Sequence, residues 1–159
     1  MKRLKTNYDI VVVGGGHAGL EASLIAHKRG VSVLLVSMDK NSIGRTSCNP
    51  AVGGLAKGQM IKEVDVLGGV MGFFADKSTL QSKTLNMSKG RSVWSPRSQI
   101  DKIKYEAVVQ KHIKNICLPV LEGEVVKIEE SGSKISSVVF SDGFQLFCRA
   151  AVLTCGTFL

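Results

Sequence analysis

The sequence lacks the features that mark several classes of protein. No apolar stretch approaches the roughly 20 residues of a membrane span, and residues 1–9 are basic without the apolar core of a secretory signal. Proline is scarce, with 3 residues against 17 glycines, which favours tight turns between regular elements over a disordered chain. We therefore expect a cytoplasmic protein with a packed core and no membrane association.

Cysteine pairs and metal-ligand clusters are also missing. The four cysteines form no C-x-x-C pair, and the three histidines do not lie beside them at ligand spacing. These residues are Cys48, Cys117, Cys148, Cys155, His17, His27 and His112. Neither a disulfide framework nor a metal site is expected.

The formal net charge of +8 fits a polyanionic partner such as nucleic acid, but it also fits an ordinary solvated surface. No zinc finger, aromatic RNP motif or KH loop is visible, so composition alone favours the solvated surface.

The N-terminal segment carries a dinucleotide-binding pattern. Tyr8–Val13 reads YDIVVV, as a strand buried on both faces does, and GGGHAG follows at Gly14–Gly19. Apolar residues then recur at helical spacing up to Gly30, and Val31–Val36 reads as a second buried strand. Strand, glycine loop, helix and strand form the βαβ context that the Rossmann fingerprint requires.

Each glycine of this loop has a physical role. Gly14 permits the tight turn, Gly16 lets the backbone approach a pyrophosphate, and Gly19 lets the helix pack close to the sheet. The helix N-terminus adds N–H groups and the positive end of its dipole. The predicted phosphate-binding residues are Gly14, Gly15, Gly16, His17, Ala18 and Gly19. His17 either donates to a phosphate or shapes the loop, and the second role is favoured.

The acidic residue that usually ends the second strand is missing. Ser37 stands there and is the candidate for the ribose hydroxyl, while Asp39 comes slightly late. No arginine is present for a 2′-phosphate.

The remaining elements favour an FAD domain over a plain NAD domain. A long connection spans Asp39–Gly58. A helix is expected from Gly54 to Gly68. The mixed pattern of residues 72–98 predicts no particular element. A helix from Ser98 or Gln99 precedes a three-stranded antiparallel meander. The expected strands are Val120–Ile128, Ile135–Phe140 and Phe144–Cys148, followed by a last buried strand at Ala150–Thr154.

The predicted fold is thus α/β: a Rossmann-like FAD-binding domain of the glutathione-reductase type, with a parallel sheet and the meander. Thr154 and Gly156, at the end of the last strand, are where the chain is expected to come back to the cofactor and contact it. Because the chain stops on two large apolar residues just after a buried strand, we expect residues 1–159 to be the truncated N-terminal part of one domain.

Four segments resemble the GidA/MnmG family of tRNA uridine 5-carboxymethylaminomethyl modification enzymes. They are GGGHAGLEAS at 14–23, TSCNPAVGGLAKGQMIKEVDVLGGVMG at 46–72, LNMSKGRSVWSPRSQID at 85–101 and AVLTCGTFL at 151–159. The resemblance covers nearly the whole chain, and the SCNPA block is its most specific part.

The resemblance implies an FAD enzyme that is reduced by NADH and takes a one-carbon unit from methylenetetrahydrofolate. With the GTPase partner MnmE, such enzymes modify C5 of the wobble uridine of tRNA, and they are homodimers. Cys48 matches the catalytic cysteine of SCNPA, and Val126 is the residue whose backbone meets the adenine. A second cysteine of the family lies beyond Leu159, so a two-cysteine mechanism is incomplete here. The chain alone is expected to be inactive, because the contacts with NADH and the GTPase are absent.

Three other interpretations stay open. They are a general oxidoreductase of the same fold, a folate-dependent tRNA uracil-5-methyltransferase, and a remnant that merely binds nucleotide. The absence of C-x-x-C argues against a disulfide oxidoreductase.

A loosely basic segment contains Lys83, Lys89, Arg91, Trp94 and Arg97. It is interpreted either as solvated surface or as a contact for tRNA or a flavin phosphate, with Trp94 stacking on a base. Trp94 and Arg91 stand at positions where other family members can have different residues.

Overall fold

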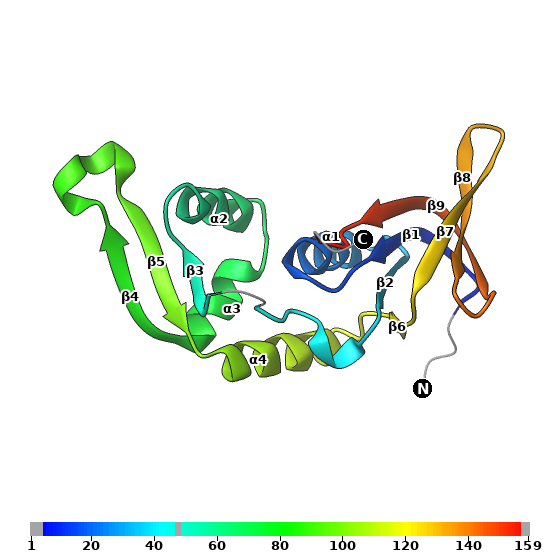
Figure 1. Cartoon of the computed structure of the whole chain (residues 1–159), viewed down its shortest axis with the longest axis horizontal. Coiled ribbons are helices and arrows are strands. Elements are labelled where there is room, and N and C mark those ends of the chain that lie inside the picture. Colours follow the sequence, from blue (N-terminus) through cyan, green and yellow to red (C-terminus); the bar gives the residue numbers. More distant parts are fainter. Residues whose placement is uncertain (1–4, 47–48, 157–159) are drawn as a thin grey trace. The chain divides into compact units, whose positions relative to one another are not determined.

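The computed structural model describes residues 5–46 and 49–156. The chain divides into two compact units, the first made of Met1–Ile43 and Ile113–Leu159 and the second of Gly44–His112 (Figure 1). The assignment of residues 1–159 to one truncated domain stays a prediction.

The first unit is a six-stranded mixed sheet with one helix. Its elements are β1 (Asn7–Val13), α1 (His17–Lys28), β2 (Val33–Ser37), the 3-10 turn η1 (Lys40–Ser42), β6 (Val120–Glu122), β7 (Val125–Ser131), β8 (Lys134–Phe140) and β9 (Gln145–Leu153). The strand order is β6-β2-β1-β9-β8-β7. The first four strands are parallel, and β9, β8 and β7 form the antiparallel meander. The predicted fold class is confirmed.

Two strand boundaries of the sequence prediction are wrong. The single strand predicted over Val120–Ile128 breaks at Gly123, where a Cβ would lie 2.8 Å from the Phe140 ring. Its two halves join different neighbours, β2 and β8. Conversely, the two strands predicted over 144–154 form one continuous strand, β9. It pairs antiparallel with β8 at its start and parallel with β1 along its length. One strand therefore joins the meander to the parallel sheet.

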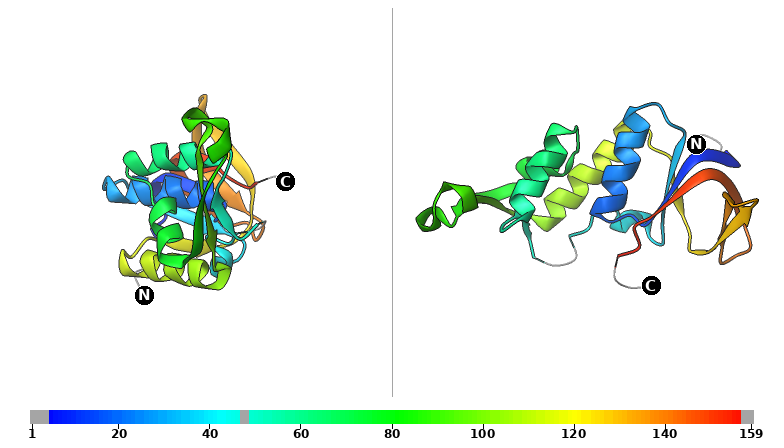
Figure 2. Two further views of the ribbon diagram at one scale, coloured as in Figure 1. Left: turned by 90° about the vertical axis from the view of Figure 1, so that its left-hand side faces the viewer. Right: turned by 90° about the horizontal axis from the view of Figure 1, so that it is seen from above.

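The core of the first unit follows from the apolar strands. β2 is buried at every position. α1 lies against β1 and β2 (Figure 2), and its Leu20 and Leu24 are buried. Beyond the parallel strands, the core continues under the meander with Val138, Phe140 and Leu146. This core holds the carboxyl ends of β1, β2 and β9 at one edge of the sheet.

The second unit is a three-stranded antiparallel sheet with helices. Its elements are β3 (Ala51–Gly53), α2 (Lys57–Val66), α3 (Met71–Ser78), β4 (Thr79–Leu85), the 3-10 turns η2 (Met87–Lys89) and η3 (Arg91–Val93), β5 (Ser95–Ile100) and α4 (Lys102–Asn115), whose last turn belongs to the first unit. The order is β3-β5-β4.

Within this unit the predicted helix over Gly54–Gly68 is confirmed as α2. The helix predicted from Ser98 or Gln99 is α4, which starts later, at Lys102. Ser98 and Gln99 lie in β5, and Asp101 starts the helix by accepting the Lys104 amide at 3.0 Å. The predicted apolar stripe of α4 is confirmed: Tyr105 is fully buried against the Phe74 ring.

No helix in the described ranges is both long enough and apolar enough to cross a bilayer.

Candidate dinucleotide-binding site

The glycine loop lies between the end of β1 and the start of α1. Gly14 has φ +111°, and its amide donates to the Val36 carbonyl at 2.9 Å. A Cβ on Gly14 would overlap the carbonyl oxygen of Thr154, and a Cβ on the buried Gly19 would overlap the carbonyl oxygen of Gly14. These two positions admit only glycine, because backbone fills the space that a side chain needs.

Gly16 differs from its neighbours. It precedes α1 in extended backbone (φ −70°, ψ −175°), a conformation open to any residue, and nothing lies within 4 Å of the position of a Cβ. No side chain caps the helix there. The exposed backbone at Gly16 and the first-turn amides of α1 therefore form an open corner suited to an anion.

Thr154 braces this loop from the end of β9. Its hydroxyl lies 2.9 Å from the Val13 carbonyl and 3.0 Å from that of Gly14, and its amide donates to Val13 at 2.8 Å. Gly156 follows, exposed and with φ +78°. The structure thus brings Thr154 against the predicted phosphate loop, and the cofactor contacts of Thr154 and Gly156 stay predictions.

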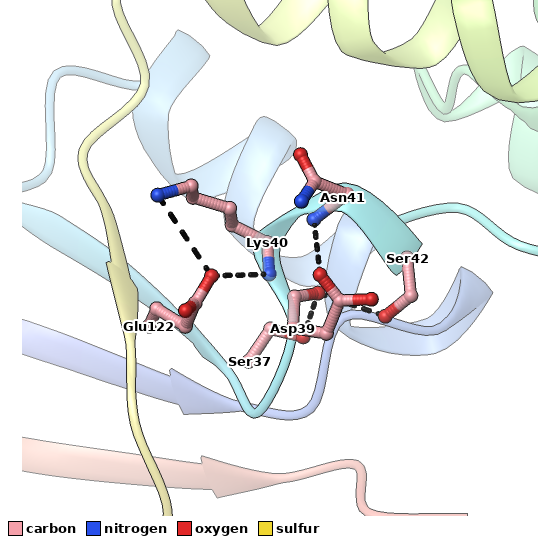
Figure 3. Close-up of polar contacts among 6 residues, drawn as sticks. All are labelled: Ser37, Asp39, Lys40, Asn41, Ser42 and Glu122. Carbon is pink, nitrogen blue, oxygen red and sulfur yellow. Dashed lines mark hydrogen bonds and ion pairs between the residues drawn. The ribbon is translucent and has the colours of Figure 1, made fainter.

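Ser37 ends β2 beside the loop, and its hydroxyl donates to the Asp39 carbonyl at 2.9 Å (Figure 3). A Cβ on Gly15 would lie 3.0 Å from the Ser37 oxygen and 2.8 Å from Ile43, a buried neighbour that sequence reasoning missed. No local pattern in the sequence indicates that Ile43, near the start of the Asp39–Gly58 connection, packs there. Ser37 thus presents acceptor lone pairs next to the loop, as a ribose contact requires.

The acidic groups near Ser37 are engaged in local structure. The Asp39 carboxylate accepts the Asn41 amide at 2.8 Å and caps η1. Glu122, opposite Ser37 in the β2–β6 ladder, accepts the Lys40 amide at 3.2 Å and lies 3.9 Å from its ammonium group (Figure 3). Asp39 therefore caps the turn that follows β2.

Val126 lies in β7 with 59% of its surface exposed. The register of β7 against β8 shifts between Val125 and Lys127, so Val126 falls at an irregularity of the ladder. Bulges leave a residue outside regular pairing. The adenine contact of its backbone stays a prediction.

His17 is half-buried at the start of α1, and Ala18 beside it is exposed. Burial lowers the pKa of His17 from its ordinary value of 6.5, and the charge of Glu21 acts in the opposite direction. The imidazole is accordingly neutral at neutral pH, which agrees with a role in shaping the loop.

Cys48, the predicted catalytic residue, lies outside the described residues. Arg45 and Lys57, two cations near Cys48 in the sequence, are expected to favour its thiolate. Arg45 forms an ion pair with Glu106, with 3.8 Å between Nε and Oε1, and Lys57 is the exposed first residue of α2.

Because Cys148 and Cys155 lie in or beside predicted strands, the sequence favours small core residues at both positions. Cys148 is buried, and burial raises the pKa of its thiol from 9.0. The interpretation is wrong for Cys155, which lies exposed just after β9.

Comparisons with known proteins agree with this geometry. The family model described as "Glucose inhibited division protein A" matches residues 9–159. The tRNA uridine 5-carboxymethylaminomethyl modification enzyme MnmG of Endomicrobium trichonymphae is 41% identical over 157 residues, which are 98% of this chain and 26% of that protein. The chain therefore spans about a quarter of the length of such relatives.

Solved structures give the same result. Aquifex aeolicus GidA superposes with a TM-score of 0.92 at 42% identity, over 96% of this chain and 26% of that one. A flavin monooxygenase from Stenotrophomonas maltophilia, 21% identical, shares the fold with a TM-score of 0.55 over 92% of this chain and 38% of its own. The chain belongs to the glucose inhibited division protein A family.

Proposed function

We propose that this chain binds FAD, with the pyrophosphate at the open corner formed by Gly16 and the N-terminus of α1. The observation that carries the proposal is the contrast within the loop: Gly14 and Gly19 are closed by backbone, whereas Gly16 faces empty space. An uncapped helix N-terminus with room beside it is suited to a phosphate group.

The surrounding residues fit the rest of such a cofactor. Thr154 ties the loop to the end of β9, which keeps the amides of the loop in place without a ligand. Because the Ser37 hydroxyl already donates to Asp39, Ser37 accepts a hydrogen bond from a ribose hydroxyl. Val126 offers backbone to the adenine at the irregularity in β7.

We further propose that the protein acts in tRNA modification, as the names of its relatives say of them. The reaction installs a (carboxymethyl)aminomethyl group at C5 of the wobble uridine, with NADH as reductant, methylenetetrahydrofolate as one-carbon donor, and the GTPase MnmE and a second copy of the protein as partners. Bound FAD supplies the redox chemistry. Cys48, which matches the cysteine of the family's SCNPA motif, is proposed to supply a thiolate for the reaction.

Cofactor binding is tested by the visible spectrum of the purified chain after incubation with FAD and gel filtration. We expect retained flavin absorbance, because the loop is already shaped for phosphate. A chain that is folded by circular dichroism and elutes free of flavin would contradict the cofactor assignment.

The modification is tested in a chimera in which this chain replaces the matching quarter of the E. trichonymphae enzyme. Mass spectrometry of tRNA nucleosides is expected to show the 5-carboxymethylaminomethyl product, and Cys48→Ser is expected to abolish it while flavin stays bound. Formation of 5-methyluridine instead would favour the methyltransferase interpretation.

A further inference from the structure

The β4–β5 hairpin of the second unit concentrates positive charge. Residues 79–100 contain four cations and no acidic residue, and they account for half of the formal net charge of +8. The cations are Lys83, Lys89, Arg91 and Arg97, all exposed. Within the described part of the chain, none of the four takes part in an ion pair.

The arrangement of these charges costs folding free energy. Lys83 and Arg97 are direct partners in the β4–β5 ladder, and like charges placed opposite each other across strands are destabilising. Water and salt screen part of this repulsion, whereas a bound polyanion neutralises both charges directly.

An oriented aromatic ring lies at the tip of the same hairpin. Trp94 is 38% exposed as a residue, and its indole N–H donates to the Met87 carbonyl at 3.2 Å. The Arg91 guanidinium carbon lies 5.7 Å from the ring centroid, in cation–π range. The Trp94 carbonyl accepts from Gln59 of α2 at 3.2 Å, which anchors the tip to the body of the unit.

A ring held in place beside cations combines the two means by which proteins bind single-stranded nucleic acid. Cations track the phosphates, and the aromatic face stacks on a base. An acidic protein segment would satisfy the charges but would leave the ring without a stacking partner.

We propose that the β4–β5 hairpin binds unpaired RNA, with a base stacked at Trp94 beside Arg91 and phosphates along Lys83, Lys89 and Arg97. The proposal deepens, and rests on, the proposed action on tRNA. It assigns an RNA-binding surface to the second unit, separate from the dinucleotide loop of the first.

The test uses Trp94 as its own reporter, because it is the only tryptophan in the sequence. A short uridine-rich single-stranded RNA is titrated into the full chain while tryptophan emission and the anisotropy of labelled RNA are recorded at constant flavin content. We expect emission to be quenched as the RNA binds, because stacking on the indole quenches it. A blunt RNA duplex and polyglutamate, which carry charge but offer no unpaired base, are expected to leave the emission unchanged.

Variants separate stacking from charge. Trp94→Ala is expected to weaken RNA binding roughly 5- to 100-fold, and Trp94→Phe to restore most of it. Arg97→Ala is expected to lower the slope of log affinity against log salt by about 1. Lys134→Ala, which removes an exposed cation from β8 of the first unit, is the matched control and is expected to change neither quantity.

Three results would overturn the proposal: RNA that saturates the chain without quenching Trp94, equal quenching by polyglutamate, or equal weakening by Lys134→Ala. The flavin spectrum is read on the same samples. Flavin retention with no response of Trp94 would refute the hairpin assignment and leave the cofactor assignment intact.

Discussion

The two units of this protein differ in how far their strands are buried. In the first, β2 is buried at all five positions, and glycines are closed in by backbone. In the second, β4 is exposed over five consecutive residues, and the tip of its hairpin carries exposed Met87, Val93 and Trp94. The first unit has a glycine loop beside an uncapped helix N-terminus, whereas the hairpin of the second exposes cations and apolar side chains.

This contrast also explains what could be predicted from sequence. Strands buried on both faces read as apolar runs, so YDIVVV and VSVLLV predicted β1 and β2, and the glycine spacing predicted the turn between them. β4 and β5 have no such pattern, because neither face is regularly buried. Region 72–98 could therefore not be assigned.

Some contacts in the candidate site could not be predicted from the sequence either. The role of Gly16 follows from motif spacing, but the closure of Gly14 by Thr154 joins residues 140 apart in the chain. Likewise, nothing local indicates that Ile43 and Ser37 pack around Gly15. Contacts of this kind depend on tertiary structure, which leaves no periodic trace in the sequence.

The largest expected effect sharpens the comparison between buried and exposed strands. Leu34→Ala in β2 removes a fully buried side chain and should lower the free energy of unfolding by about 2–5 kcal/mol. Leu80→Ala in β4, where the leucine is 67% exposed, should change it by less than about 0.5 kcal/mol. Urea denaturation measures both, and equal losses would mean that β4 is covered in solution.

A smaller difference in stability is expected between alanine substitutions at two glycines of the first unit. Gly14→Ala and Gly132→Ala both force alanine to positive φ, +111° and +58°, but only Gly14 also meets backbone. Overpacking should make Gly14→Ala more destabilising than Gly132→Ala by about 1–3 kcal/mol. Thermal melts that coincide for the two variants would contradict the closed loop.

A pH effect is expected in the first unit from His17. Its pKa is lowered in the folded chain, so below pH 6.5 the unfolded chain takes up a proton that the folded chain does not. The free energy of unfolding should therefore fall as the pH drops below 6.5, and His17→Gln should reduce that fall. Identical pH profiles of the two proteins would show that His17 is not buried as described.

The smallest effect concerns thiol reactivity. Cys148 is buried with a raised pKa, whereas Cys117 and Cys155 are exposed. Alkylation at neutral pH followed by peptide mass spectrometry should modify Cys117 and Cys155 well before Cys148. Early modification of Cys148 would mean that the meander opens readily.

The central claim is that the first unit holds the pyrophosphate of FAD at Gly16. Calorimetric titration of FAD into the chain tests it, with Gly16→Ala compared against Gly72→Ala. The control is the same change on α3 of the second unit, where a Cβ meets only side-chain atoms, of Asp65 at 3.2 Å and of Ile61 at 3.8 Å. Since a Cβ at Gly16 meets nothing in the structure, both variants should fold as the parent does. Loss of FAD binding in Gly16→Ala alone is the predicted result, and undiminished binding by that variant would contradict the account.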